Sequence, residues 1–331
     1  MANDVKVIIK VTKASARADF GIPLILAASH GSAVTYKEVG SLDEIVAAGF
    51  AATTDVYDAA QLLFTQNNAP GKIAVCGVTE DAVTALPAIL NEGWRQLIVI
   101  GDDSVEEISN YIETCGKKCM YFCHVNSTNY AEVIEAITGN DRTVAVAYDS
   151  DDVGCPEAAL VGATAGLDVG SFTYKNIILK GVSAQKYTDN EVDDLHSMNV
   201  ITILKKVGDI VTSEGIALSG EYIDIVDTKD YILTQIEYQS QSLLNRVPKL
   251  PYDNRGIASL EGVVVSVLMD AADLGMIAQN DDGTFNYTVE FGSRSECADS
   301  DISTRAYNEG KFSFALAGAI HTGTVNGTII A

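Results

Sequence analysis

The feature that most constrains this fold is an alternation of short apolar runs with amphipathic helical patterns, from residue 21 to about residue 205. Short apolar runs between turn residues are typical of buried strands, and the intervening segments have the spacing of helices. This alternation predicts βαβ units and a parallel sheet covered on both faces. The predicted strands are Ile22–Ala28, Lys72–Cys76, Gln96–Ile100, Lys118–His124 and Thr143–Ala147, and the predicted helices are Asp55–Asn67, Asp81–Asn91, Val105–Cys115 and Asn129–Thr138.

Capping signals mark several of the expected helix starts. In a capping box, a Ser or Thr side chain and a Glu side chain three residues later each accept a hydrogen bond from the other's backbone N–H. The pairs with this spacing are Ser41 and Glu44, Ser104 and Glu107, and Thr188 and Glu191.

The pattern changes after residue 205, where two long helices are followed mainly by strands. The helices are expected at Asp227–Asn245 and Ser259–Leu274, and the strands at Thr284–Phe291, Phe312–Ile320 and Thr324–Ile330. The fold class is therefore α/β, with a βαβ-type central domain followed by an α+β domain and terminal β-strand arms. We expect an N-terminal arm over residues 1–20, an α/β domain over 21–205 and an α+β domain over 206–331.

The charge of the chain excludes several classes of partner. Its net charge is −23, which disfavours binding to nucleic acid and to anionic membranes. Lys6 and Lys10 interrupt the only early apolar stretch, so no signal peptide is expected, and no apolar run is long enough to predict a membrane anchor. Six scattered cysteines without a disulfide framework indicate synthesis in a reducing cytoplasm.

A parallel α/β sheet often carries a nucleotide site, yet the glycine motifs of such sites are missing. The sequence contains neither G-x-G-x-x-G nor a P-loop. Gly162, Gly166 and Gly170 recur every four residues, and a close helix contact with loop turns explains them better than phosphate binding.

Metal and catalytic centres are also not expected. Cys115, Cys119 and Cys123 have C-x3-C-x3-C spacing, but Cys119 and Cys123 alternate with Tyr121 along one face of a predicted strand, which favours buried thiols. The acidic run 149–152 lacks the ligand pattern of a calcium loop and is interpreted as a solvated loop. The four histidines, His30, His124, His196 and His321, form no metal or catalytic motif. We predict no catalytic residue, no cofactor and no metal.

The two ends of the chain predict intersubunit strands. Residues 5–11 alternate an apolar face with a mostly basic face, as expected for a β-strand. Such a strand can pair within its own sheet or be donated to a neighbouring copy. For the C-terminal end, a local hairpin with its turn at Asn326 and Gly327 is a further alternative.

Three segments resemble contractile phage tail sheath proteins. Residues 35–78 combine T-Y-K-E-V-G-S-L-D-E-I, a helix, and N-N-A-P-G-K-I-A-V-C-G-V, similar to the opening of sheath proteins. Residues 218–237 resemble the family's strand leading into its long helix, and residues 305–327 resemble the C-terminal segment of the smaller sheath proteins. The chain is short for the family, which leaves little room for extra outer domains.

The resemblance implies a structural subunit of a contractile sheath, found in phage tails and in phage-tail-like bacteriocins. Subunits of that family polymerise into a helical cylinder of sixfold rings around an inner tail tube protein, above a baseplate, and contraction drives the tube through a cell envelope. The implied location is a virion tail or an extracellular phage-tail-like particle that is assembled in the bacterial cytoplasm. Terminal arms in the family add strands to neighbouring subunits. The residues expected at such interfaces here are Val5, Lys6, Val7, Ile9, Lys10, Val11, Phe312, Phe314, Leu316, Val325 and Ile329.

Two alternatives remain open at this point. An oligomeric α/β enzyme or nucleotide-binding protein would have the same central pattern, but it predicts the glycine loop that the sequence lacks. An inner tube subunit would self-assemble too, although tube proteins are usually smaller and dominated by β-structure.

Overall fold

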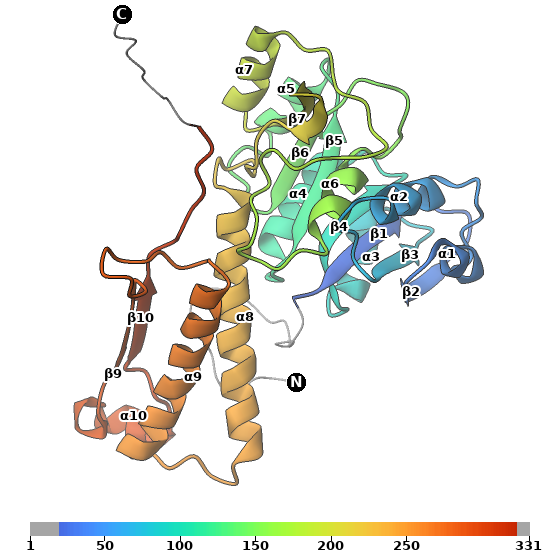
Figure 1. Ribbon diagram of the computed structural model, residues 1–331. Coiled ribbons are helices and arrows are strands. Elements are labelled where there is room, and N and C mark those ends of the chain that lie inside the picture. The colour runs from blue at the N-terminus through green and yellow to red at the C-terminus, as the bar shows by residue number, and fades with distance from the viewer. Residues whose placement is uncertain (1–19, 323–331) are drawn as a thin grey trace, which may run out of the picture.

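The structure is a computed structural model, and it describes residues 20–322 of the 331-residue chain. Its larger part is an eight-stranded sheet with the order β2-β3-β1-β4-β5-β6-β7-β8 (Figure 1). The strands β3, β1, β4, β5, β6 and β7 run parallel, whereas β2 and β8 pair antiparallel at the two edges. The strands are β1 (Ile22–Ala27), β2 (Val34–Val39), β3 (Ile73–Gly77), β4 (Trp94–Ile100), β5 (Met120–Val125), β6 (Thr143–Ala147), β7 (Ile201–Lys206) and β8 (Asp209–Thr212).

Helices cover both faces of this sheet, because the central strands are apolar on both sides. One face packs against α1 (Leu42–Ala48), α2 (Asp55–Phe64) and α6 (Glu157–Thr164). The other face packs against α3 (Ala82–Ile89), α4 (Val105–Thr114), α5 (Tyr130–Glu135) and α7 (Asp189–Ser197). The predicted α/β class with a parallel-rich sheet is therefore confirmed.

The C-terminal part consists of two long helices and a small sheet (Figure 1). The helices α8 (Ile223–Arg246) and α9 (Asn254–Asp273) pack together and share a third apolar core with the strands β9 (Tyr287–Phe291) and β10 (Gly310–Phe314). A short 3-10 helix, η1 (Arg294–Glu296), and α10 (Asp299–Thr304) lie between these strands in the sequence. The small sheet lies beside α9, away from the large sheet.

Several local expectations need correction. The capping box predicted at Ser104 and Glu107 does not form, because the Ser104 hydroxyl and backbone N–H both donate to Asp102 instead. At α1 the Ser41 side chain caps Glu44, but the Glu44 carboxylate accepts from Gly40 rather than from Ser41. The box at Thr188 and Glu191 is complete.

The predicted C-terminal strands are longer than those observed. The strand expected over Phe312–Ile320 ends at Phe314, and beyond it Leu316 makes an isolated bridge with Ile277. The strand expected over Thr284–Phe291 begins only at Tyr287. The strands β2, β7 and β8 are absent from the sequence-based prediction, and α6 is expected there only as a close helix contact without bounds. The strand β8 extends the large sheet to Thr212, past residue 205. The expected strands Val5–Val11 and Thr324–Ile330 both lie outside the described residues.

Candidate functional site: an open two-stranded sheet on an anchored helix

The small sheet formed by β9 and β10 has one face that is apolar and one that is polar. The register places Phe312 opposite Val289 and Phe314 opposite Tyr287, and these side chains pack into the core against α9. The opposite face has Thr288 and Ser313, whose hydroxyl oxygens lie 2.7 Å apart. Glu290 and Lys311 are opposite each other on that same face.

The hydrogen-bonding phase of this sheet directs backbone groups outward at both edges. At one end the Gly292 N–H donates to the Glu309 carbonyl, and at the other the Ala315 N–H donates to the Asn286 carbonyl. Hydrogen-bonded and non-hydrogen-bonded pairs alternate along an antiparallel ladder, so the backbone N–H and C=O groups of Thr288 and Glu290 face the partner strand. The amides of the apolar residues between them therefore point away from the partner strand. Those residues are Val289, Phe291, Phe312 and Phe314.

Both edges are available within residues 20–322, where neither β9 nor β10 pairs with a third strand. An isolated two-stranded sheet is only marginally stable in water, and here it depends on α9 for its buried face. Unpaired strand edges are templates for strand addition. The arrangement can thus accept an extended segment on either side.

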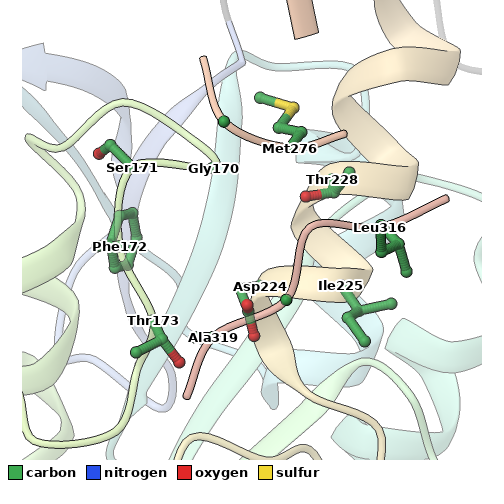
Figure 2. Close-up of a pocket in the computed structure, with 12 residues that line it drawn as sticks. Gly170, Ser171, Phe172, Thr173, Asp224, Ile225, Thr228, Met276, Leu316 and Ala319 are labelled. Atoms are coloured by element: carbon green, nitrogen blue, oxygen red, sulfur yellow. The ribbon is translucent and has the colours of Figure 1, made fainter. Parts of the chain in front are cut away.

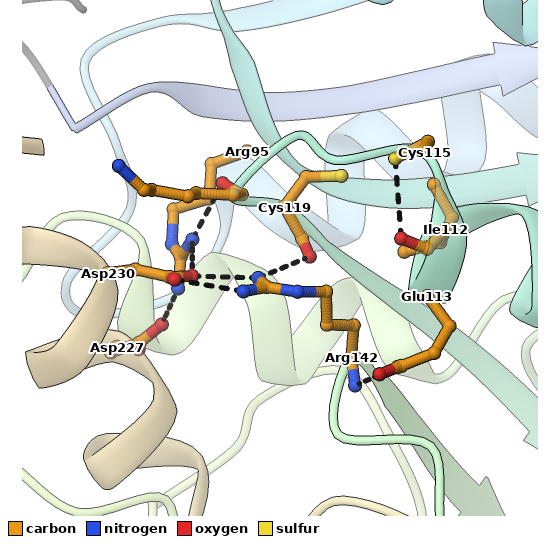
Figure 3. Close-up of polar contacts among 9 residues, drawn as sticks. Arg95, Ile112, Glu113, Cys115, Cys119, Arg142, Asp227 and Asp230 are labelled. Carbon is orange, nitrogen blue, oxygen red and sulfur yellow. Dashed lines mark hydrogen bonds and ion pairs between the residues drawn. The ribbon is translucent and has the colours of Figure 1, made fainter. Parts of the chain in front are cut away.

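The support for this sheet is fixed to the large sheet by a buried charge cluster (Figure 3). Arg95 lies at the start of β4 and is 2% exposed. Its guanidinium forms ion pairs with Asp227 and Asp230 of α8, and Nη1 lies 2.9 Å from the Asp230 carboxylate. Arg142 donates to both oxygens of the same carboxylate at 2.8 and 2.9 Å. The Tyr174 hydroxyl donates to Asp227 at 2.8 Å.

The electrostatics of the cluster are nearly balanced, with two guanidinium groups facing two carboxylates. Burial by itself raises the pKa of Asp230, but the charge of Arg95 and the hydrogen bonds from Arg142 outweigh burial and hold this pKa below its usual value. A paired buried cluster of this kind fixes geometry, because any loss of one partner leaves a buried charge unpaired. It therefore holds the first half of α8 in one orientation on the sheet.

The segments that lead to both termini contact the same half of α8. Phe20, the first described residue, lies with its ring centroid 4.1 Å from the Arg95 guanidinium and 5.8 Å from the Tyr231 ring centroid. At the other end, His321 Nε2 lies 2.9 Å from the Thr173 hydroxyl, and its ring stands edge-on to Tyr222 at 4.9 Å. Both ends of the described chain are thus attached near the N-terminal half of α8, where this helix meets the large sheet.

A small pocket of about 290 Å³ lies beside the C-terminal segment (Figure 2). Its walls are the loop 170–173, the first turns of α8 and residues 316–319. Asp224 points into it, burial raises the pKa of this carboxyl, and its Oδ1 atom is buried without a hydrogen-bond partner among the described groups. The pocket therefore lies where the C-terminal segment runs past the first turns of α8.

The thiols and acidic residues considered from the sequence are placed as structural groups. Tyr121 and Cys123 of β5, with Cys119 just before it, share one core on the same face of the sheet, as predicted. Asp149 accepts from the Ser127 N–H, and Asp152 accepts from the Tyr148 and Ser183 hydroxyls. Within residues 20–322, no three Cys, His, Asp or Glu side chains are grouped closely enough to hold a metal ion, and no helix has the length and apolarity to cross a membrane.

The predicted interface residues are only partly within the described chain. Phe312 and Phe314 lie in β10, and Leu316 lies just after it. The remaining predicted interface residues are outside the described range: Val5, Lys6, Val7, Ile9, Lys10, Val11, Val325 and Ile329. Sequence reasoning missed the charge cluster, although Asp227 and Asp230 stand three residues apart, on one side of a helix whose buried positions are mostly apolar. Two acidic residues with that spacing were a usable signal.

Comparison with known proteins rests on structure. No protein family model and no curated protein sequence matches the chain. A chain of the anti-feeding prophage baseplate, in a sixfold-symmetrised reconstruction, matches with a TM-score of 0.75 and 15% identity, over 99% of this chain and 98% of that one. The contracted helical sheath of the same prophage matches with a TM-score of 0.73 and 16% identity over 99% of each chain.

A third match comes from another injection system. The contracted sheath complex of an extracellular contractile injection system, PVC, has a TM-score of 0.72 and 13% identity, with 99% of this chain and 98% of that chain covered. These similarities extend over nearly the whole chain, both the large sheet and the helix pair with its small sheet. The chain has the fold of the sheath proteins of contractile injection systems.

Proposed function

We propose that this protein is the sheath subunit of a contractile injection system, with a structural and not an enzymatic role. Copies of the chain polymerise into a helical cylinder of sixfold rings around an inner tube protein, joined to a baseplate. Contraction of the cylinder drives the tube through a cell envelope. The fold similarity to two sheaths in the contracted state supports this proposal, and the open two-stranded sheet is the single feature that carries it.

The terminal arms are the proposed connectors. Residues 5–11 of one subunit add a strand to an open edge of the small sheet in a neighbour, and the C-terminal segment of a subunit adds to an edge in the same manner. In a strand of alternating character, Val5, Val7, Ile9 and Val11 extend the apolar layer over the neighbour's α9. Lys6 and Lys10 then lie on the polar face, near Glu290.

Strand addition suits a sheath that changes its packing. Backbone hydrogen bonds fix register without depending on particular side chains, so a donated strand can keep subunits connected while their bodies rotate. In the proposed subunit, residues 1–20 form an arm, residues 21–205 an α/β domain and residues 206–331 a C-terminal domain. Because the buried charge cluster joins α8 to the large sheet, we expect the large sheet and the helix pair to move as one rigid body.

The assembly is located in a phage tail or an extracellular phage-tail-like particle after cytoplasmic synthesis. Electron microscopy of the purified protein tests the proposed polymerisation directly: long hollow cylinders are expected for the intact chain. Deleting residues 1–13 should leave a folded, soluble subunit that no longer forms cylinders, because the first donated strand is missing.

Two point variants test whether the backbone of the proposed strand is needed for polymerisation. Val7→Pro removes one ladder donor in the proposed strand and should abolish polymerisation, whereas Val7→Ile preserves the strand and should not. Circular dichroism checks that each variant is folded. Normal cylinders from the truncated chain would contradict the donated-arm model, and so would its unfolding, since that would place the strand in its own domain's core.

A further inference from the structure

The hairpin that joins β7 and β8 has a turn with an unexpected residue at its tip. Lys206 pairs with Asp209, which leaves Val207 and Gly208 as a two-residue loop. Their φ angles are 52° and 104°, so both central residues have positive φ, as a type I′ turn requires. Asn-Gly and Asp-Gly are the sequences that such a turn favours.

Valine is disfavoured at this place for two separate reasons. A β-branched side chain crowds the backbone when φ is positive, because two heavy atoms on Cβ approach the neighbouring peptide groups. In addition, the side chain is completely exposed, with a relative accessibility of 107%, so nothing within the described chain packs on it. Neither local conformation nor burial against residues 20–322 explains the valine.

The surroundings of Val207 are partly apolar and carry more basic than acidic groups, although the exposed Asp209 also flanks the turn. Lys205 is exposed, and Lys206 donates through Nζ to Asn176 at 3.0 Å. The segment containing Ile178 pairs antiparallel with β8, and Ile178 is 48% exposed. In the same register the exposed Lys180 falls opposite Asp209, beside the turn. We call this surface, formed by Ile178, Lys180, Lys205, Lys206 and Val207, the hairpin-tip patch.

The patch contrasts with the rest of the molecule. The chain has a net charge of −23, so another copy presents more acidic than basic groups overall. A basic rim around an exposed apolar side chain is complementary to such a surface, and the central apolar group gains most from removal of water.

We propose that the hairpin-tip patch is a second interface, which docks onto the acidic surface of another copy of this chain. This inference rests on the proposed function for the assembly, but it is independent of the terminal arms. Val207 inserts at the centre of the contact, and Lys180 and Lys205 lie opposite carboxylates of the neighbour. The strained turn holds Val207 at the outermost point of the hairpin.

The test separates the stability of the subunit from its assembly. Val207→Asn matches the turn preference, so the Tm of a non-polymerising form lacking residues 1–13 should rise by about 2 °C. The same substitution in the full chain should raise the concentration needed for polymerisation about tenfold, since it removes the apolar centre of the contact. Lys205→Glu should weaken polymerisation without altering the fold.

Two control variants are expected to behave like the parent chain. Val207→Ile keeps both the apolar character and the strain and should polymerise like the parent chain. Val46→Ala alters another exposed valine, 48% exposed in α1, and should change neither readout. Wild-type polymerisation of Val207→Asn would overturn the inference.

The outcomes also distinguish this inference from the proposed function. If the intact chain forms no cylinders, the sheath proposal fails, and sedimentation velocity then measures self-association of soluble subunits with and without Val207→Asn. Weaker self-association of the variant would support the patch as an interface, whereas unchanged association would overturn it.

Discussion

At the scale of single residues, the Asp230 carboxylate decides how the two parts of the molecule are joined. It accepts hydrogen bonds from Arg95 of β4 and from Arg142, which precedes β6. All three side chains are largely buried, so water cannot replace a missing partner. The cost of breaking one pair is therefore larger than the net value of the pair itself.

Asp230→Asn is expected to lower the free energy of unfolding by about 3 kcal/mol at pH 7, because it leaves two buried guanidinium groups with one carboxylate. The folded-state pKa of Asp230 is depressed, so its contribution is fully present above the unfolded pKa of about 4. It is lost as the pH falls through the folded pKa. Urea unfolding from pH 7 down to pH 2 should therefore show the gap between the two proteins closing below about pH 4.

The matched control is Asp281→Asn, which alters an exposed aspartate in the turn before β9. Its effect should stay within about 0.5 kcal/mol at every pH. A gap for Asp230→Asn that does not narrow in acid would show that the carboxylate charge is not the stabilising group.

At the scale of elements, the contact of α2 with α6 explains a glycine pattern that is visible in the sequence. A Cβ atom added at Gly162 in α6 would lie 2.4 Å from the Leu63 carbonyl oxygen of α2. The backbones approach closely because no side chain separates them there. The predicted close helix contact is thus confirmed at this position.

Gly162→Ala should destabilise the fold by about 1–3 kcal/mol, because the backbone of α2 must move to admit the methyl group. Gly262 offers a matched control, since it also lies inside a helix, α9, with no atom near the added Cβ. Gly262→Ala should stabilise by about 0.5–1 kcal/mol through its higher helix propensity. Thermal unfolding of the two variants in the background lacking residues 1–13 would measure both effects, and equal shifts of the same sign would contradict the packing argument.

At the scale of the whole molecule, an acceptor sheet and donor arms make each subunit both a template and a connector. A subunit without residues 1–13 keeps both open edges of its small sheet. It can therefore still accept strands from intact copies, while it no longer donates its N-terminal strand. Such a subunit should join a growing cylinder and stop its extension.

Mixing the truncated subunit with intact chain at a ratio of about one to ten should shorten the cylinders, because each incorporated copy leaves neighbours unconnected. Length distributions from electron micrographs measure this. The control is a truncated subunit that also carries Phe312→Pro, which damages the acceptor strand and should leave cylinder length unchanged. Unchanged length with the simple truncation would mean that the arm is not the connector.

The sequence by itself determined the features that depend on local periodicity. The parallel-rich sheet followed from alternating apolar runs and helices, and the burial of Cys119 and Cys123 followed from a two-residue strand repeat. The complete capping box at Thr188 is likewise a short-range signal. Each of these depends on residues within a few positions of one another, so the pattern is readable without the fold.

Only the tertiary structure decided the features that join distant segments. Arg95 and Asp227 are 132 residues apart, and nothing in the local pattern of either segment specifies the other. The capping box expected at Ser104 failed because Asp102 offers a competing carboxylate to the same groups. The open edges of β9 and β10 depend on which strands pair and in which phase, and pairing between segments far apart in sequence is set by the packing of the whole chain.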